Sequence, residues 1–288
     1  MTHRARFGRS LVALAALWLG GVGGLGACSD GPAPPGGTAL PPPMPPPPPS
    51  RPAGDPEPLA VTVRAEYPHD PDAFTQGLLV DGDRLFESTG LHGRSSVREV
   101  EIATGKVLRR QDLPSRLFGE GLAEVGERLI QLTWQSGLAL IWDRDRFTRE
   151  GELSYSGEGW GLTWDGERLI MSDGSSWLLF RDPRTFDELG RVQVTLNGRP
   201  LPRLNELEWV DGAVWANVWQ SESIVRIDPT TGEVTGVADC SGLESRLPPG
   251  SSATIDVLNG IAYWPAHHTF LVTGKLWPKL FEVSFDEP

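Results

Sequence analysis

A three-residue phrase that recurs five times limits the folds open to this chain more than any other feature of its sequence. Successive copies are 44, 40, 45 and 54 residues apart, and a turn such as Asp81-Gly82 or Asp165-Gly166 follows each of the first four. The copies are Gln76-Gly77-Leu78, Glu120-Gly121-Leu122, Trp160-Gly161-Leu162, Asn205-Glu206-Leu207 and Asn259-Gly260-Ile261. A recurring period of this length, with a tight turn in each unit, is typical of stacked or radially arranged repeats. Because the first position varies chemically while the frame repeats, the pattern predicts a scaffold that brings five different side chains to one place.

Each repeat divides into about four short β-forming segments. Turn sequences such as Asp228-Pro229-Thr230-Thr231-Gly232 separate them, since proline presets φ and glycine tolerates positive φ. No window has a sustained 3.6-residue apolar period, so we expect little helix. Four short antiparallel strands are one propeller blade, and five copies in residues 59–288 predict an all-β, five-bladed β-propeller. A solenoid is the alternative, but it would expose two end faces that need capping.

The fifth repeat contains three evident strands, which indicates that its fourth lies elsewhere. Residues 59–65, at the other end of the domain, have a strand-forming sequence. We therefore expect this N-terminal strand to pair with the last blade. Such pairing would close the ring and leave no open sheet edge.

The first 27 residues have the pattern of a signal peptide. Arg4, Arg6 and Arg9 precede an apolar run over residues 11–19 that is too short to span a bilayer as a mature helix. The segment ends in Leu25-Gly26-Ala27-Cys28, which resembles a bacterial lipobox, so we expect Cys28 to be lipidated. The alternative is an ordinary signal peptide followed by an incidental cysteine.

A proline-rich linker separates this segment from the repeats. Together with Cys28 it forms residues 28–58, of which nearly half are proline, and such a tract favours extended polyproline II. We expect it to hold the domain of residues 59–288 away from a membrane surface; the alternative is a proline-rich ligand for another protein. Cys240 is the one cysteine of that domain, so no internal disulfide can form there.

The charge of the chain excludes one class of partner. Its formal net charge is −12, and loss of the three arginines in residues 1–27 would leave −15. An acidic protein of this kind repels nucleic acid, so we expect no nucleic-acid partner.

The phrases around the repeats closely resemble the plant and bacterial type of glutamine cyclotransferase, over the whole of residues 59–288. The motifs that carry the resemblance are Tyr67-Pro68-His69-Asp70-Pro71, Phe118-Gly119-Glu120-Gly121-Leu122, Gly159-Trp160-Gly161-Leu162 and Thr273-Gly274-Lys275-Leu276-Trp277. The resemblance implies a five-bladed propeller that converts the N-terminal glutamine of peptides and proteins into pyroglutamate and releases ammonia. We expect a monomer without a cofactor.

Glu120 is the candidate catalytic residue. It is the one acidic side chain at the first position of the five copies, and the family's catalytic glutamate corresponds to it. A single carboxylate could take a proton from the attacking nitrogen and return it to the leaving nitrogen. Nearby aromatic side chains would exclude water and raise its pKa. The alternative is a solvated surface charge.

The candidate substrate-binding residues are of three kinds. Gln76 and Asn205 share the repeat phase of Glu120 and offer neutral amides, while Lys275 could bind a substrate carbonyl or an oxyanion. Five aromatic residues resemble the family's pocket, and we expect tryptophan N–H groups there to reach substrate oxygens. These aromatic residues are Phe74, Phe118, Trp134, Trp160 and Trp219.

The histidines of the domain do not predict a metal site. No pair among His69, His92, His267 and His268 has zinc-ligand spacing with a third ligand nearby, so we interpret them as structural or exposed. A structural cation bound by loop carbonyls stays open.

Two other functions are compatible with a propeller. One is a non-catalytic scaffold lipoprotein of the outer membrane, and the other is a hydrolase or lactonase. The latter usually needs a cation held by several carboxylates on the axis, where the repeats offer one. Ser29, and not an aspartate, follows Cys28, so we expect a protein anchored to the bacterial outer membrane or located in the periplasm. The native substrates are not predicted.

Overall fold

The computed structural model describes residues 54–286, which form an all-β fold. The predicted signal peptide, the predicted lipidation site Cys28 and nearly all of the linker lie outside the described residues. Helix is limited in residues 54–286 to the short segments α1 (Ser241–Glu244) and η1 (Ser251–Ala253), as the sequence predicts. None of the helices described is long and apolar enough to cross a membrane.

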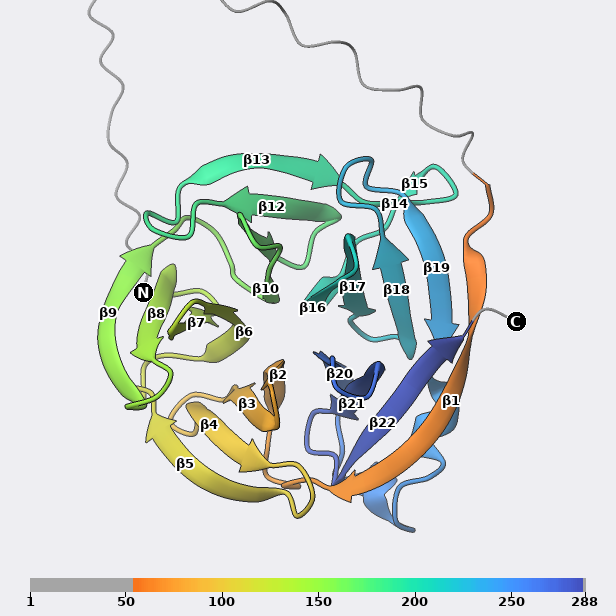
Figure 1. Ribbon diagram of the computed structural model, residues 1–288, viewed down its shortest axis with the longest axis horizontal. Helices are drawn as coiled ribbons and strands as arrows, with labels where there is room; N and C mark the ends of the chain where they lie inside the picture. Colours follow the sequence, from red (N-terminus) through yellow and green to blue (C-terminus); the bar gives the residue numbers. More distant parts are fainter. Residues whose placement is uncertain (1–53, 287–288) are drawn as a thin grey trace, which may run out of the picture. The chain divides into compact units, whose positions relative to one another are not determined.

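Three four-stranded antiparallel sheets follow one another along the chain (Figure 1), and in each of them consecutive strands pair in order. The first sheet contains β2 (Thr75–Asp81), β3 (Arg84–Thr89), β4 (Ser96–Glu101) and β5 (Lys106–Asp112). The second contains β6 (Gly119–Val125), β7 (Arg128–Thr133), β8 (Leu138–Asp143) and β9 (Thr148–Ser154). The third contains β10 (Leu162–Trp164), β11 (Leu169–Ser172), β12 (Trp177–Arg181) and β13 (Glu188–Gln193).

The remaining long strands form one eight-stranded sheet in the order β16-β17-β18-β19-β1-β22-β21-β20. Its first half is β16 (Leu204–Val210), β17 (Ala213–Val218), β18 (Ser223–Ile227) and β19 (Val234–Asp239). Its second half is β1 (Glu57–Pro68), β22 (Lys279–Asp286), β21 (Thr269–Gly274) and β20 (Leu258–Trp264). The halves are joined by a short parallel pairing of β1 with β19, so the sheet consists of two further four-stranded units.

The N-terminal strand pairs with the C-terminal one, as the sequence predicts. β1 runs antiparallel to β22 from Ala60 opposite Asp286 to Pro68 opposite Lys279. The strand is longer at both ends than the predicted residues 59–65. The parallel contact with β19, from Glu57 opposite Gly236, was not predicted.

A two-stranded hairpin formed by β14 (Thr195–Leu196) and β15 (Arg199–Pro200) lies outside the four-stranded units. Its turn is Asn197-Gly198, and both residues have positive φ, of 52° and 71°. Asn-Gly is a typical hairpin turn because both residues tolerate this conformation. This hairpin, which precedes β16 in the chain, was not predicted from the sequence.

In each unit, the strand at the repeated phrase lies nearest the common centre in Figure 1. We call these inner strands; they are β2, β6, β10, β16 and β20. Neighbouring inner strands approach backbone to backbone, which explains the repeated glycine: a Cβ atom on Gly77 would lie 2.6 Å from the Leu122 nitrogen, and one on Gly121 would lie 2.5 Å from the Leu162 nitrogen. The repeated phrase therefore marks the points where the inner strands meet.

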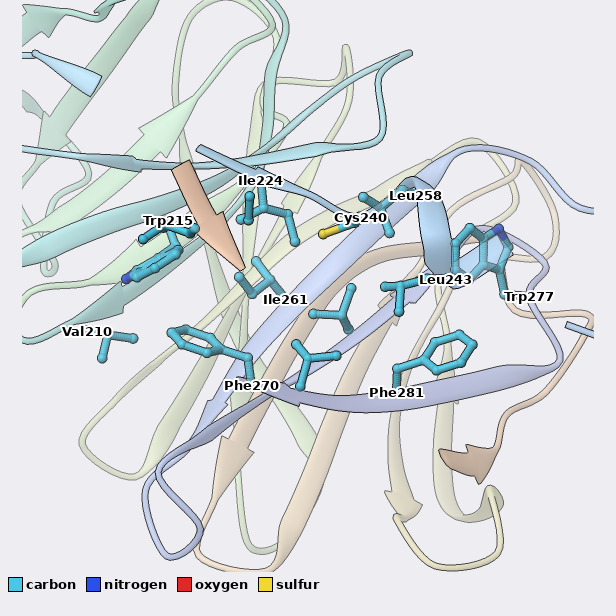
Figure 2. Packing of buried hydrophobic residues seen from close by; sticks show 14 of the residues in the cluster. Val210, Trp215, Ile224, Cys240, Leu243, Leu258, Ile261, Phe270, Trp277 and Phe281 are labelled. Carbon is cyan, nitrogen blue, oxygen red and sulfur yellow. The ribbon is translucent and has the colours of Figure 1, made fainter. Parts of the chain in front are cut away.

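Hydrophobic clusters fill the space between units. Figure 2 shows the cluster that includes Trp215 and Ile224 from one half of the eight-stranded sheet and Ile261, Phe270 and Phe281 from the other. Val61 and Val63 of β1 pack against the same cluster. The buried, unpaired Cys240 also belongs to it. The two halves are thus held together by burial of apolar side chains, and β1 takes part in that burial.

Candidate active site

All nine residues that the sequence analysis selected for catalysis and substrate binding line one cavity of about 320 Å³. A tenth residue, Asp256, lines it as well and was not predicted. The lining residues are Phe74, Gln76, Phe118, Glu120, Trp134, Trp160, Asn205, Trp219, Asp256 and Lys275.

The repeat explains how most of these side chains reach the cavity. Gln76, Glu120 and Asn205 are each the second residue of an inner strand, and Phe74 and Phe118 directly precede such strands. The residues that directly follow the strand paired with an inner strand form another equivalent set. These are Trp134 after β7, Trp219 after β17 and Lys275 after β21. Because equivalent strand ends meet around the centre, two positions per repeat build one site.

The Glu120 carboxyl group is buried and sparsely bonded. The residue is 4% exposed, and Gln76 Nε2 donates a hydrogen bond of 3.0 Å to its Oε1. Asn259 Nδ2 in turn donates to Gln76 Oε1 at 3.2 Å, which fixes the orientation of the Gln76 amide. Among residues 54–286, Gln76 is the one hydrogen-bond donor to this carboxyl group, so Oε2 is left for a ligand.

The surroundings favour the neutral form of Glu120. Burial raises its pKa well above the usual value; the Lys275 charge lowers it, and the Glu158 charge raises it further. Burial lowers the pKa of Lys275, against the effects of Glu120 and Asp256. Both groups therefore titrate closer to neutrality than they would in water, which suits acid–base chemistry near pH 7.

The segment that carries Lys275 is fixed by backbone hydrogen bonds. The Lys275 N–H donates to the Val257 carbonyl, and its carbonyl accepts from the Asp256 N–H, both at 2.9 Å. The Leu276 N–H donates to the Ala73 carbonyl at 2.6 Å. Lys275 Nζ lies 4.8 Å from the centroid of the Phe74 ring. The ammonium group thus sits against an aromatic wall of the cavity.

Glu158, which was not predicted from the sequence, binds the indole N–H groups of two tryptophans that line the cavity. Its Oε2 accepts hydrogen bonds from Trp134 Nε1 at 2.7 Å and Trp160 Nε1 at 3.0 Å. The expectation that these two indole N–H groups point at substrate oxygens is therefore wrong for Trp134 and Trp160. Trp160 also meets Trp219 edge to face, with ring centroids 5.4 Å apart.

Asn205 offers an unused acceptor. The residue is 2% exposed, and no side chain or backbone group of the described part of the chain bonds to its Oδ1. A buried polar atom without a partner is costly. Since Asn205 lines the cavity, its oxygen can accept a hydrogen bond from a ligand there.

The first residue of the fifth repeat has a different position. Asn259 does not line the cavity but donates to Gln76 and, at 3.0 Å, to the Thr75 carbonyl. Four of the five variable positions therefore meet in the cavity, and the fifth orients one of them.

A second buried carboxyl lies among the inner strands, at the position where the fourth repeat replaces glycine. Glu206 is fully buried, and its Oε1 and Oε2 accept hydrogen bonds from the Leu78 N–H at 3.1 Å and the Ile261 N–H at 2.7 Å. Burial raises its pKa well above the usual value. Glu206 occupies the second position of its copy and does not line the cavity, so Glu120 is still the one carboxylate at the first position of the five copies.

The histidine in the Tyr67-Pro68-His69 motif is structural, as predicted. His69 is buried; its Nδ1 lies 2.7 Å from the Trp277 carbonyl and its Nε2 lies 3.1 Å from Glu87 Oε1. Arg98 is paired with Glu87 and Asp70 in the same buried network. Within residues 54–286, no group of three or more His, Cys, Asp or Glu side chains is placed to hold a metal ion.

The chain is similar to known proteins in both sequence and structure. The model of the glutamine cyclotransferase family matches residues 45–285. A glutaminyl-peptide cyclotransferase of Arabidopsis thaliana is 45% identical over 229 residues, which are 79% of this chain and 72% of that protein. The crystal structure of Myxococcus xanthus glutaminyl cyclase is similar with a TM-score of 0.75 at 41% identity, and the match covers 81% of this chain and 99% of that one.

Proposed function

The chain belongs to the glutamine cyclotransferase family, and we propose that Glu120 carries the proton in its reaction. Its activity is that of a glutaminyl-peptide cyclotransferase, which converts an N-terminal glutamine into pyroglutamate and releases ammonia. The observation that carries the proposed mechanism is a buried carboxyl with one protein hydrogen bond that faces an aromatic cavity.

The reaction is a ring closure within one residue. The α-amine attacks the γ-amide carbon, a C–N bond forms, and the C–NH₂ bond breaks. Because nucleophile and electrophile are already tethered, the site must fold the side chain back, move a proton and stabilise the oxyanion. In our proposal Glu120, as carboxylate, takes the proton from the attacking nitrogen and delivers it to the leaving nitrogen, which departs as ammonia.

The other polar groups of the cavity suit the remaining tasks. Asn205 Oδ1 accepts a hydrogen bond from the substrate γ-amide, which orients the leaving group. The Lys275 ammonium faces the developing oxyanion, where a buried positive charge is most effective. The aromatic residues of the cavity exclude water and enclose the glutamine side chain.

A single assay tests this function. The protein is incubated with a dipeptide that begins with glutamine, and ammonia is measured with and without a chelator. We expect ammonia release in both cases, and none from the isomeric dipeptide with glutamine at the second position. Failure to release ammonia from the first dipeptide would contradict the proposed function.

The fold has a corresponding interpretation. We propose that the five four-stranded units are five blades of a β-propeller whose ring is closed by β1. The pairing of β1 with β22 and the arrangement in Figure 1 support this proposal. A chain that begins at residue 69 lacks β1 and the buried Leu59, whose burial alone stabilises by ~1.5–3 kcal/mol. It should melt at a much lower temperature than a chain that begins at residue 55; equal melting temperatures would contradict closure by β1.

We also propose that the protein is exported and lipid-anchored. Residues 1–27 would be a signal peptide, Cys28 the attachment site, and residues 28–58 a tether for the catalytic domain of residues 59–288, acting as a monomer at the outer membrane. Cys28→Ser should move the protein from the membrane to the soluble fraction, with unchanged activity per molecule. Retention in washed membranes would contradict the anchor.

A further inference from the structure

A second, larger cavity of about 580 Å³ adjoins the candidate active site. It lies between the turn after β17, which contains Gln220 and Glu222, the helix α1 with Glu244, and the segment that leads into β20. We call this cavity the side groove. None of the groups in the proposed mechanism requires a groove of this size.

Three chain segments run directly from the active-site cavity into the side groove. Asp256 lines both. Trp219 lines the active-site cavity and the next residue, Gln220, lines the groove; likewise Lys275 lines the first and Trp277 the second. The two cavities therefore adjoin each other, with Asp256 as a common lining residue.

The junction between the cavities is well fixed. Asp256 Oδ1 accepts from the Val257 N–H at 2.6 Å, and the Asp256 carbonyl accepts from Trp277 Nε1 at 2.9 Å. Trp277 packs edge to face against Phe281, and in Figure 2 it belongs to the same cluster as Leu258, which also lines the groove. The floor of the groove is thus rigid and partly apolar.

The side groove is acidic. Glu222, Glu244 and Asp256 line it, and no lysine or arginine is among the lining residues from the described part of the chain. Arg246, close to Glu244 in sequence, is held by Glu66 at 3.2 Å. Carboxylates around a groove attract a cationic ligand.

A peptide substrate must extend beyond the active-site cavity, because the glutaminyl residue alone reacts there. We propose that the side groove binds the residues that follow the N-terminal glutamine and favours lysine or arginine at the second or third position. This inference rests on the proposed cyclotransferase function. It identifies the preferred substrates as peptides with a basic side chain near their N-terminal glutamine.

The test compares two amidated tripeptides, Gln-Ala-Lys and Gln-Ala-Glu, which differ only in their third residue. On the same enzyme sample the ratio of their kcat/KM values removes effects of folding and of chemistry. For the wild type at low salt we expect the lysine peptide to be favoured by about three- to tenfold, from exposed pairs that each contribute a few-fold. The ratio should decline as salt is added.

Two variants test whether the preference for the lysine peptide comes from the side groove. The double substitution Glu222→Gln with Glu244→Gln should bring the ratio close to one, whereas Glu127→Gln, which removes an exposed charge in the turn between β6 and β7, should preserve it. Equal rates for both peptides in the wild type, or a preference that survives the double substitution, would overturn the inference. If neither peptide is cyclised, the proposed function itself fails.

Discussion

Two buried glutamates near the centre of the molecule, Glu120 and Glu206, differ in the use made of their oxygens. Both lie at the second or third residue of an inner strand, and burial raises the pKa of both. Each carboxyl oxygen of Glu206 accepts a hydrogen bond from a backbone N–H group of another inner strand. Glu120 has one side-chain partner and faces an open cavity.

The comparison shows that a raised pKa does not by itself identify a catalytic carboxyl. Glu206 joins β16 to β2 and β20 by satisfying N–H groups that would otherwise be buried without partners, so its environment is complete. The environment of Glu120 is completed only by a ligand. An unused acceptor beside a cavity distinguishes the two residues.

Glu120 and Glu206 have different partners because they occupy neighbouring positions of the repeated phrase. Glu120 occupies the variable position, and Glu206 occupies the position that is glycine in the other copies. At Gly77, Gly121 and Gly161 the neighbouring inner strand leaves no room for a side chain; a Cβ atom on Gly121, for example, would lie 2.5 Å from the Leu162 nitrogen. In the fourth repeat the side chain at that position, Glu206, bonds to backbone N–H groups of two other inner strands.

The largest expected effect is on turnover by Glu120→Gln. The carboxamide keeps the shape and can still accept the hydrogen bond from Gln76, but it cannot carry the proton. General acid–base catalysis contributes about 10²–10⁴-fold, so kcat for ammonia release should fall by this factor while the melting temperature stays close to that of the wild type. A decrease in kcat of less than about tenfold would contradict the role of Glu120 as the group that carries the proton.

Glu206→Ala should affect stability instead. The substitution leaves the N–H groups of Leu78 and Ile261 unpaired, at ~1–3 kcal/mol each, so the free energy of unfolding in urea should fall by ~2–6 kcal/mol. The folded variant keeps Glu120 and its acid–base contribution, so its rate of ammonia release should stay within about tenfold of the wild-type rate. Wild-type stability, or a turnover loss as large as that of Glu120→Gln, would break the contrast between the two residues.

A smaller effect is expected from Glu158→Gln. Both indole N–H groups bond to the same oxygen, Oε2, so a glutamine carbonyl oxygen can still accept them, but the oxygen that accepts from Gln135 Nε2 at 2.9 Å becomes an NH₂ group. The loss of that hydrogen bond and of the charge on the acceptor, ~1 kcal/mol, should loosen the two indole rings and raise KM several-fold. The substitution also removes a negative charge that raises the pKa of Glu120, so the acid limb of the kcat profile should move to lower pH. An unchanged limb would show that Glu120 does not control it.

The sequence predicted which residues meet in the cavity where the repeat fixes their phase. Gln76, Glu120 and Asn205 could be selected because the period places them at equivalent strand positions. Trp134 and Trp219 each lie 14 residues after the variable residue of their repeat, and Lys275 lies 16 after Asn259, so a second periodic signal was available for the strand-end residues.

Residues outside the repeated frame could not be found in this way. Asp256 lies in a connection between units, and Glu158 lies in the approach to β10; their roles depend on how these loops fold over the cavity. The parallel contact of β1 with β19 likewise depends on the three-dimensional closeness of two units, and no local pattern signals it.

The pH dependence of kcat, measured for the wild type and for the residual activity of Glu120→Gln, tests most directly whether Glu120 carries the proton. The carboxylate is the working form, and burial raises its pKa, so wild-type kcat should fall as the pH is lowered through a value above the usual ~4.3 of glutamate. This acid limb should be absent from Glu120→Gln. If the variant shows the same limb as the wild type, another group titrates and the account is wrong.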